Sequence, residues 1–329
     1  MNILMLLTLA TAFIPAEQIM TVNGPVPANN LGKTLVHEHV LVDFIGADKT
    51  NENRWDKTTV LNKVVPYFIE AKQAGVQAVV ECTPAFLGRD VRLLKILSDK
   101  TGIQFITNTG YYGARSNKHL PSWAFTETPE QLAARWTREF EHGIDGTGIK
   151  PGFIKISVDG PTNGLTEIHK KLVRAAAITH LKTGLIIFSH TGPARAAFEQ
   201  LDILQEMKVK PDAFVWVHAQ AEKDKSLHIR AAKMGAWVSL DNVGVNNDYY
   251  VEALINLKEA GVLNRVLLSH DAGYYRPGEP DGGDFRGYTT IFKTLIPQLK
   301  EKGFSEEDIE QLIIKNPAAA LKMKEKVGL

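Results

Sequence analysis

Residues 34–44 read TLVHEHVLVDF, an apolar run that is interrupted by two histidines and a glutamate. Its length and its content of Val and Leu predict a strand buried on both faces. Seven further runs of this kind follow along the chain, and each is bounded by turn-forming residues. The eight predicted strands cover residues 34–44, 77–84, 104–113, 152–160, 184–192, 213–220, 236–244 and 265–273.

Segments with helical periodicity lie between these strands, for example at residues 58–75, 167–184 and 248–261. Strands that alternate with helices predict parallel βα units. Eight units favour an α/β fold of the (β/α)8 TIM barrel type over a doubly wound open sheet, which more often has roughly five to seven strands. Residues 304–326 predict two short helices packed over the barrel, with Pro317 near the start of the second.

The composition limits the classes of partner and of metal site. The 38 Lys and Arg residues nearly balance the 37 Asp and Glu residues, and no basic run stands out, which argues against a nucleic-acid partner. The single cysteine, Cys82, excludes an intramolecular disulfide and a zinc cluster built on cysteine. Any metal must therefore be held by histidines and carboxylates.

Residues 1–16, MNILMLLTLATAFIPA, are too short for a comfortable membrane span but suit the apolar core of a signal peptide that is cut after Ala16. No Lys or Arg precedes Lys33, so a buried N-terminal element or a mis-assigned start codon are the alternatives. With the signal peptide, we expect a periplasmic or secreted protein, and without it a cytoplasmic one. No Pro/Ser-rich linker divides residues 17–329, which predicts one barrel domain.

Ionisable residues gather at the carboxyl ends of the predicted strands, the face that forms the active site of a (β/α)8 barrel. A lone buried histidine is usually a hydrogen-bonded core residue. Many such groups at one height are too costly to bury without compensation, and a metal centre supplies it. The residues are His37, His39, Glu81, Lys155, His190, His218, Asp241, His270 and Asp271.

His37 and His39 stand two residues apart, so in a strand their side chains point to the same face, toward the barrel interior. Glu38 points the other way. The spacing suits two imidazoles that bind one ion and differs from the helical HExxH signature, in which the histidines are four apart.

Lys155 lies in the middle of the apolar stretch FIKIS. Burial penalises its ammonium form, and a neutral amine can react with carbon dioxide to give an anionic carbamate able to bridge two metal ions. An ion pair with Glu81 or Asp271 is the alternative explanation, and the spacing alone does not separate the two.

Taken together in this order, several motifs resemble the phosphotriesterase family of the amidohydrolase superfamily, which includes the phosphotriesterase-like lactonases. The resemblance runs from about residue 21 to residue 324. The matching stretches are TVNGPVPANNLGKTLVHEHV, TPAFLGRDV, TGYYG, GFIKISVDG, the HTG of FSHTG, the strand ending VHAQ, LLSHDAG and KNPAAALK.

The resemblance implies a centre of two divalent metal ions, with Zn²⁺ as the expected metal, which suits a site of histidines and carboxylates. It also implies a homodimer. Lys155, as N6-carboxylysine, would bridge the ions together with a hydroxide, and Asp271 would accept the proton. The implied ligands are His37, His39 and Asp271 for the more buried ion, and His190 and His218 for the more exposed one. His270 would point away from the ions.

The implied reaction is hydrolysis of a lactone, carboxylic ester or phosphotriester. Asn242 stands where the lactonases usually have an arginine, and VHAQAEKD replaces their usual His-Leu-Gly-Asp run, so an acyl-homoserine lactone is not the favoured substrate. Residues 272–288 form a long loop that should shape the pocket. The candidate substrate-binding residues are Tyr111, Tyr112, Tyr274 and Arg276, for each of which ordinary loop packing is the alternative.

Two other functions are weighed against this hydrolase. The first is a metal-dependent lyase or isomerase on the same scaffold, with Asp271 as a base on carbon. The second is a barrel that binds a small molecule without chemistry. All six expected ligand positions are filled in this sequence, which favours an enzyme.

Overall fold

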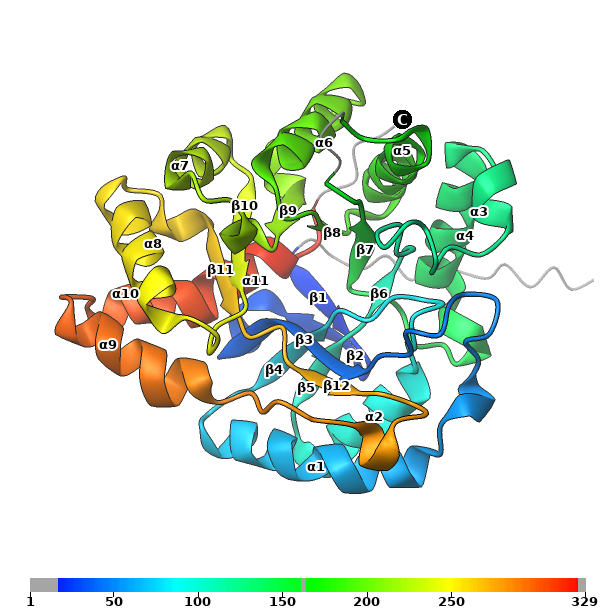
Figure 1. Ribbon diagram of the computed structural model, residues 1–329, viewed down its shortest axis with the longest axis horizontal. Helices are drawn as coiled ribbons and strands as arrows, with labels where there is room; N and C mark the ends of the chain where they lie inside the picture. The colour runs from blue at the N-terminus through cyan, green and yellow to red at the C-terminus, as the bar shows by residue number, and fades with distance from the viewer. Residues whose placement is uncertain (1–16, 161–163, 325–329) are drawn as a thin grey trace, which may run out of the picture.

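Each of the eight predicted runs forms a parallel strand at the centre of the molecule (Figure 1). The computed structural model describes residues 17–160 and 164–324, so the predicted signal peptide lies outside the described residues. The third run is split into two strands by Thr107. The strands are β3 Thr34–Leu41, β4 Ala78–Glu81, β5 Gln104–Ile106, β6 Asn108–Thr109, β7 Phe153–Ser157, β8 Ile187–His190, β9 Phe214–Val217, β10 Trp237–Asp241 and β11 Val266–Ser269.

The strands form two sheets with the orders β11-β10-β9-β8-β7-β6 and β12-β3-β4-β5, where β12 covers Gly273–Tyr275. Since β5 and β6 are one interrupted run, they join the sheets on one side. On the other side, the backbone N–H of Asp271 donates to the carbonyl of His37 at 3.0 Å, and that of His39 donates to Ala272 at 2.9 Å. The strands therefore surround one axis as a (β/α)8 barrel.

Helices surround the strands on the outside (Figure 1). The helices predicted at 58–75, 167–184 and 248–261 are present as α1, α5 and α8, and Asp56 caps α1 by accepting the N–H of Thr59 at 2.8 Å. The helices are α1 Lys57–Gln73, α2 Val91–Thr101, α3 Trp123–Thr126, α4 Pro129–His142, α5 Glu167–Thr183, α6 Ala194–Glu206, α7 Lys225–Met234, α8 Asn247–Glu259, α9 Ile296–Glu301, α10 Glu306–Glu310 and α11 Asn316–Leu321.

The two helices predicted near the C-terminus are α10 and α11, but a π-helical turn over Gln311–Lys315 joins them into one continuous helical stretch. Pro317 lies in the first turn of α11, as expected. The buried Asn316 side chain donates to the carbonyls of Leu263 and Val266 at 2.8 and 2.6 Å, which fixes α11 where β11 begins. This helix covers the end of the barrel opposite the carboxyl ends of the strands.

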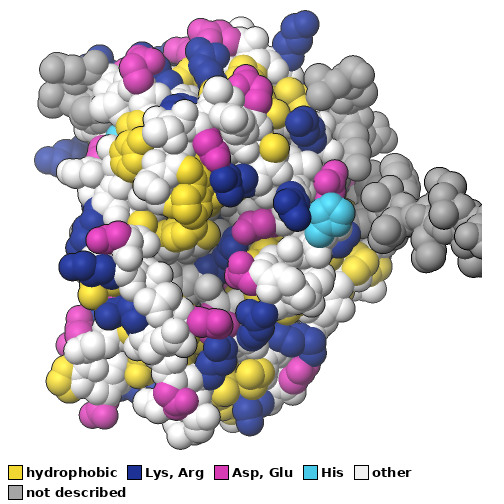
Figure 2. Space-filling view, turned by 90° about the vertical axis from the view of Figure 1, so that its right-hand side faces the viewer, with side chains coloured by type: hydrophobic (Ala, Val, Ile, Leu, Met, Phe, Trp, Pro, Cys, Tyr) yellow, Lys and Arg dark blue, Asp and Glu magenta, His cyan; other side chains and the backbone are white. Residues whose placement is uncertain are grey.

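A hairpin of β1 Gln18–Thr21 and β2 Gly24–Pro27 packs at that same end, since Ile19 is fully buried against the apolar barrel interior. On the face shown in Figure 2, Lys and Arg side chains are interspersed with Asp and Glu, so that face carries no broad field of one sign. Among the described helices, none is both long enough and apolar enough to cross a membrane.

Candidate metal centre

The six residues proposed as metal ligands meet at the carboxyl ends of the barrel strands and line one pocket of about 480 Å³. They come from five places around the barrel, which is why they are far apart in the sequence. His37 and His39 lie on β3, Lys155 on β7, His190 at the end of β8, His218 directly after β9, and Asp271 two residues after β11.

One group of three can hold a single ion. The Oδ1 atom of Asp271 lies 3.2 Å from Nε2 of His39 and 3.6 Å from Nε2 of His37. All three side chains offer a ligand atom within one small sphere, as strand alternation predicts for the two histidines. Asp271 reaches this place through a left-handed backbone conformation, with φ of 50°.

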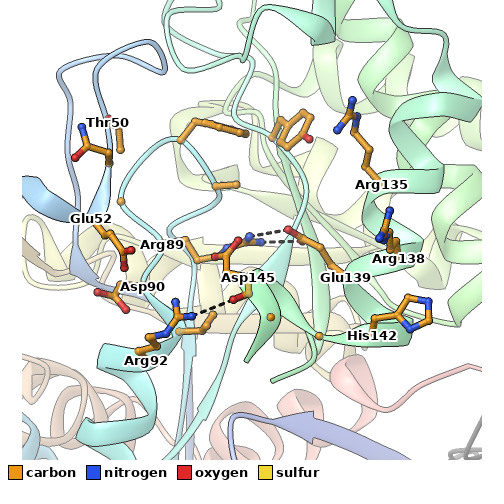
Figure 3. Close-up of a pocket in the computed structure, with 18 of the residues that line it drawn as sticks. Thr50, Glu52, Arg89, Asp90, Arg92, Arg135, Arg138, Glu139, His142 and Asp145 are labelled. Atoms are coloured by element: carbon orange, nitrogen blue, oxygen red, sulfur yellow. Dashed lines mark hydrogen bonds and ion pairs between the residues drawn. The ribbon is translucent and has the colours of Figure 1, made fainter. Parts of the chain in front are cut away.

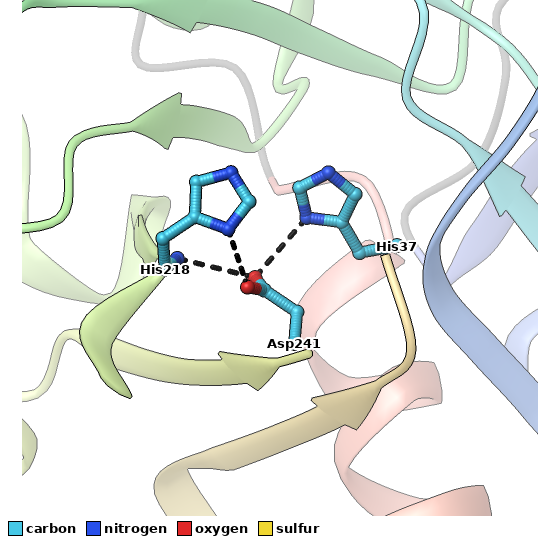
Figure 4. A group of neighbouring side chains, drawn as sticks. All are labelled: His37, His218 and Asp241. Carbon is cyan, nitrogen blue, oxygen red and sulfur yellow. Dashed lines mark hydrogen bonds and ion pairs between the residues drawn. The ribbon is translucent and has the colours of Figure 1, made fainter. Parts of the chain in front are cut away.

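Asp241 supports the centre from behind (Figure 4). Its fully buried carboxylate bonds Nδ1 of His37 at 3.1 Å and Nδ1 of His218 at 2.6 Å. Ser239 and Gln220 also donate side-chain hydrogen bonds to it. Although Asp241 could join these histidines in holding an ion, its oxygens are already satisfied. It therefore orients the two rings so that their Nε2 atoms are left for a metal.

The charges in this group reinforce one another. Burial alone would lower the pKa of His218, but the charge of Asp241 and the hydrogen bond to it raise that pKa above its ordinary value. Burial would raise the pKa of Asp241, but His218 and His37 hold it well below its usual range. Asp241 is consequently an anion that bridges the two halves of the centre.

We expect Asp241→Asn to weaken the centre and the fold together. Asparagine cannot accept a hydrogen bond from both histidines on two anionic oxygens, so metal affinity should fall about 10–100-fold and the metal-free protein should lose about 3 kcal/mol of stability. Metal titration and urea unfolding measure the two effects. The exposed Asp202 on α6 provides a control, Asp202→Asn, which should change neither quantity. Wild-type behaviour of Asp241→Asn would contradict the bridging role.

His39 has its own support. Its Nδ1 atom lies 2.8 Å from the hydroxyl of Thr83, and that hydroxyl donates to Glu81 at 2.6 Å. The hydroxyl therefore accepts from Nδ1 and leaves Nε2 of His39 facing Asp271. Glu81 is fully buried, and burial raises the pKa of its carboxyl.

Lys155 is buried, and its amine has no carboxylate partner in the part of the chain that the structure describes. Its Nζ atom lies 3.4 Å from Nε2 of His37, and the side chain is only 1% exposed. Within residues 17–160 and 164–324, no ion pair joins it to Glu81 or to Asp271, the two partners considered from the sequence. The amine thus lies in the pocket beside His37.

His190 completes the second group. Its ring centre lies 4.4 Å from that of His218, and both ring nitrogens are 3.3 Å from the hydroxyl of Tyr112. Burial, together with the charges of His218 and Lys155, holds the pKa of His190 well below its ordinary value. The neutral imidazole that results is the form that binds metal.

Glu38 links β3 to β11 through hydrogen bonds. Its side chain lies on the opposite face of the strand from His37 and His39, as the sequence predicts. Its carboxylate accepts from Nδ1 of His270 at 2.8 Å, from the hydroxyl of Ser269 at 2.7 Å and from the N–H of Ala272 at 2.9 Å. His270 accordingly points away from the pocket, as expected. Sequence reasoning placed Asp241 among the ionisable residues at the strand ends, but it assigned no specific role to Asp241 or to Glu38.

Asn242 belongs to a hydrogen-bond network that supports Asp271. It accepts a hydrogen bond at 3.1 Å from Arg286, whose guanidinium also donates to the carbonyl of Asp271 at 2.8 Å. The hydroxyl of Tyr274 donates to Oδ1 of Asp271, and its ring lies 4.6 Å from that of His39. Asp271 is therefore held from both sides.

Three of the four candidate substrate-binding residues, Tyr112, Tyr274 and Arg276, line the pocket. Tyr111 does not. Adjacent residues of an extended chain point in opposite directions, so Tyr111 faces a neighbouring cleft and accepts a hydrogen bond from Trp123. That cleft is shown in Figure 3, where the ion pair of Arg89 and Glu139 crosses its floor.

Comparisons with known proteins agree with this geometry. The sequence model of the phosphotriesterase family matches residues 17–321. The chain is 31% identical over 292 residues to the phosphotriesterase homology protein of Escherichia coli. The alignment covers 87% of this chain and 97% of that protein. It is 28% identical over 304 residues to an aryldialkylphosphatase of Saccharolobus solfataricus, in an alignment that covers 89% of this chain and 95% of that protein.

The human N-acetyltaurine hydrolase is 27% identical over 354 residues, with 93% of this chain and 98% of that protein covered. The crystal structure of the Escherichia coli homology protein, with phosphate in its active site, matches the fold with a TM-score of 0.76 at 28% identity. That match covers 89% of this chain and 99% of the other.

Proposed function

Since the chain belongs to the phosphotriesterase family, we propose that it hydrolyses a lactone or carboxylic ester at a centre of two divalent ions. At the coarser level, it is a metal-dependent hydrolase of this family. The observation that carries the proposal is the convergence of His37, His39 and Asp271. Oδ1 of Asp271 lies 3.2 Å from Nε2 of His39 and 3.6 Å from Nε2 of His37, and the buried amine of Lys155 lies beside His37.

The residues present suit two ions such as Zn²⁺. Imidazole nitrogens and a carboxylate are ordinary zinc ligands, and no thiolate is available, because the single cysteine is buried away as a free thiol. A buried amine without a carboxylate partner is costly. Conversion of Lys155 to N6-carboxylysine would remove that cost. The buried cation would become an anion able to bind the metal ions held by His37 and by the second pair of histidines, His190 and His218.

When bound, divalent ions supply a Lewis acid and lower the pKa of water, which together make hydrolysis feasible near neutral pH. The residues of the chain do the rest. Asp271 is kept ionised, because the neighbouring histidines, His39 first, hold the pKa of its carboxyl below the ordinary value despite burial, and the ionised carboxylate is the form that can accept the proton of the attacking water. Tyr274 donates to that carboxylate, and Arg286 holds the main-chain carbonyl of the same residue.

The apolar wall of the pocket suits the uncharged organic groups of an ester, a lactone or a phosphotriester. Val42, Leu87 and Phe44 line the side of the pocket between β3 and the following loops. The names of the relatives indicate that the family hydrolyses more than one kind of bond, since one is an aryldialkylphosphatase and another an N-acetyltaurine hydrolase. A substrate panel should therefore contain lactones, carboxylic esters, N-acyl amides and phosphotriesters.

Removal of metal tests the proposal directly. Dialysis of the purified protein against a chelator should abolish hydrolysis of the best ester or lactone, and Zn²⁺ should restore it, because Lewis-acid chemistry is then lost and regained. Metal analysis of the restored protein should find two ions per chain. Full activity after removal of all divalent metal would overturn the proposal.

The reaction type needs a second measurement, because a lyase or isomerase on this scaffold would also need metal. Hydrolysis in oxygen-18 water must place solvent oxygen in the product, whereas elimination or isomerisation need not. Product without the label would favour the lyase or isomerase. A barrel that binds a small molecule without chemistry would give no product at all from any member of the panel.

A further inference from the structure

Arg115 is a cation at the mouth of the metal pocket, and no acidic side chain among the described residues forms an ion pair with it. The pocket contains a second arginine, Arg276, but its guanidinium is paired with Glu279 at 3.1 Å. Throughout the residues for which the structure gives positions, no ion pair holds Arg115. Its guanidinium instead lies over the ring of Phe44, 4.6 Å from the ring centre. The positive charge of Arg115 is therefore available to a ligand in the pocket.

The backbone that carries this side chain is strained. Arg115, Ser116 and Asn117 have φ values of 58°, 56° and 62°, three consecutive left-handed residues of which none is glycine. Such a run is unfavourable for L-residues and persists only where the surroundings impose it. The carboxylate of Asp159 imposes it here, since it accepts the N–H groups of Arg115 and Ser116 at 2.8 and 3.1 Å.

The same segment of chain that carries the buried lysine also fixes this turn. Lys155, Ser157 and Asp159 are spaced by two, in and just after β7. Lys155 points into the pocket, Ser157 accepts the N–H of Ala114 at 2.6 Å, and Asp159 holds the turn itself. The position of Arg115 is thereby tied to the floor of the metal pocket through one short rigid element.

The hydroxyl of Tyr112 lies between the arginine and the ligands. It contacts the ring of His190 at 3.3 Å, and although burial raises the pKa of this hydroxyl overall, the positive charge of Arg115 acts to lower that pKa. A molecule in the pocket would thus contact the metal-capable residues at one end, the apolar side chains of Val42 and Leu87 along its length, and Arg115 at the other end.

A guanidinium offers a planar pair of donors that matches the oxygens of a carboxylate or sulfonate. We propose that the natural substrate carries such an oxyanion on the part remote from the bond that is cleaved, and that Arg115 binds it. This inference rests on the proposed function for the cleaved bond, but the charge preference can be measured without any reaction.

Calorimetric titration of the metal-loaded protein with 1-butanesulfonate tests the charge preference. Sulfonates bind divalent metals weakly, so the heat reports on the arginine more than on the ions. Butyl methyl sulfone has nearly the same shape without the charge and is the matched neutral probe. We expect the sulfonate to bind more tightly than the sulfone by roughly tenfold or more.

Arg115→Gln should remove that preference, because glutamine keeps an unbranched stem but lacks the charge. Arg230→Gln is the matched control, since Arg230 is also exposed and lies over a phenylalanine ring, that of Phe198, at 4.3 Å, on α7 outside the pocket. The control should bind both probes as the wild type does. A folded Arg115→Gln protein that retains the preference would overturn the inference.

The kinetic arm uses two aryl esters that differ only in a terminal sulfonate. We expect a lower KM for the charged ester, and a KM increase of roughly tenfold in Arg115→Gln with kcat nearly unchanged. If both esters are hydrolysed equally well and the calorimetry shows no preference, the inference fails and the proposed function stands. If neither ester nor any member of the substrate panel is hydrolysed but the sulfonate binds through Arg115, the proposed function fails and the charge preference stands.

Discussion

Lys155→Ala should lose most of its bound metal and reduce hydrolysis by more than about 100-fold, beyond the range typical for removal of a group that only supports a metal ligand. The reason is the position of the amine. It lies 3.4 Å from Nε2 of His37, inside the pocket, with no carboxylate partner among the described residues. A carbamate at this place would bridge both ions, so its loss should affect both.

Short carboxylic acids such as acetate and propionate should partly restore metal content and activity in Lys155→Ala, because their carboxylate can occupy the space of the missing carbamate. Metal analysis and ester hydrolysis measure the rescue. Lys233→Ala on α7 removes an exposed lysine and is the matched control. Unchanged metal content in Lys155→Ala would contradict the bridging role, and an absent rescue would contradict the carbamate.

Strand positions were predictable because they depend on local sequence. All eight apolar runs became barrel strands, since buried parallel strands need continuous apolar stretches and turn residues at their ends. The shared face of His37 and His39 follows from alternation within β3 alone. For the same reason one residue of the pair Tyr111 and Tyr112 had to face away from the pocket, and the structure identifies Tyr111 as that residue.

Long-range register was not predictable. The role of Asp241 depends on which side chains the closed barrel brings opposite the end of β10, and they come from positions 204 and 23 residues away. Glu38 likewise binds groups more than 230 residues away in sequence. No local pattern encodes such contacts. The left-handed turn at Arg115 is also invisible in the sequence, because Arg and Ser seldom adopt that conformation.

The second large effect concerns the paired histidines. His37→Ala and His39→Ala should each lose metal and reduce hydrolysis by more than about 100-fold. Each would remove a proposed direct ligand, and loss of a group that only supports a ligand already costs up to about that factor. Short carboxylic acids should rescue neither variant. This distinguishes loss of an imidazole from loss of the carbamate in Lys155→Ala, and it serves as an internal control for the rescue experiment.

The two variants should differ in the stability of the metal-free protein. His37 is hydrogen-bonded to the fully buried anion Asp241, whereas His39 is bonded to the neutral hydroxyl of Thr83 and lies 3.2 Å from Asp271, whose side chain is 20% exposed. Loss of a histidine leaves a fully buried anion less well compensated than one that reaches solvent, so His37→Ala should be the less stable variant by about 1 kcal/mol. Urea unfolding after chelation measures the difference, with the exposed His142 replaced in His142→Ala as a control.

Each outcome bears on a separate part of the site. Wild-type metal content in either variant would remove that histidine from the ligand set and, with it, the reason for two histidines on one face of β3. Equal stability of the two metal-free variants would instead leave the ligands intact and contradict the support by Asp241. Since metal content and unfolding are measured on the same preparations, loss of fold and loss of a ligand remain distinguishable.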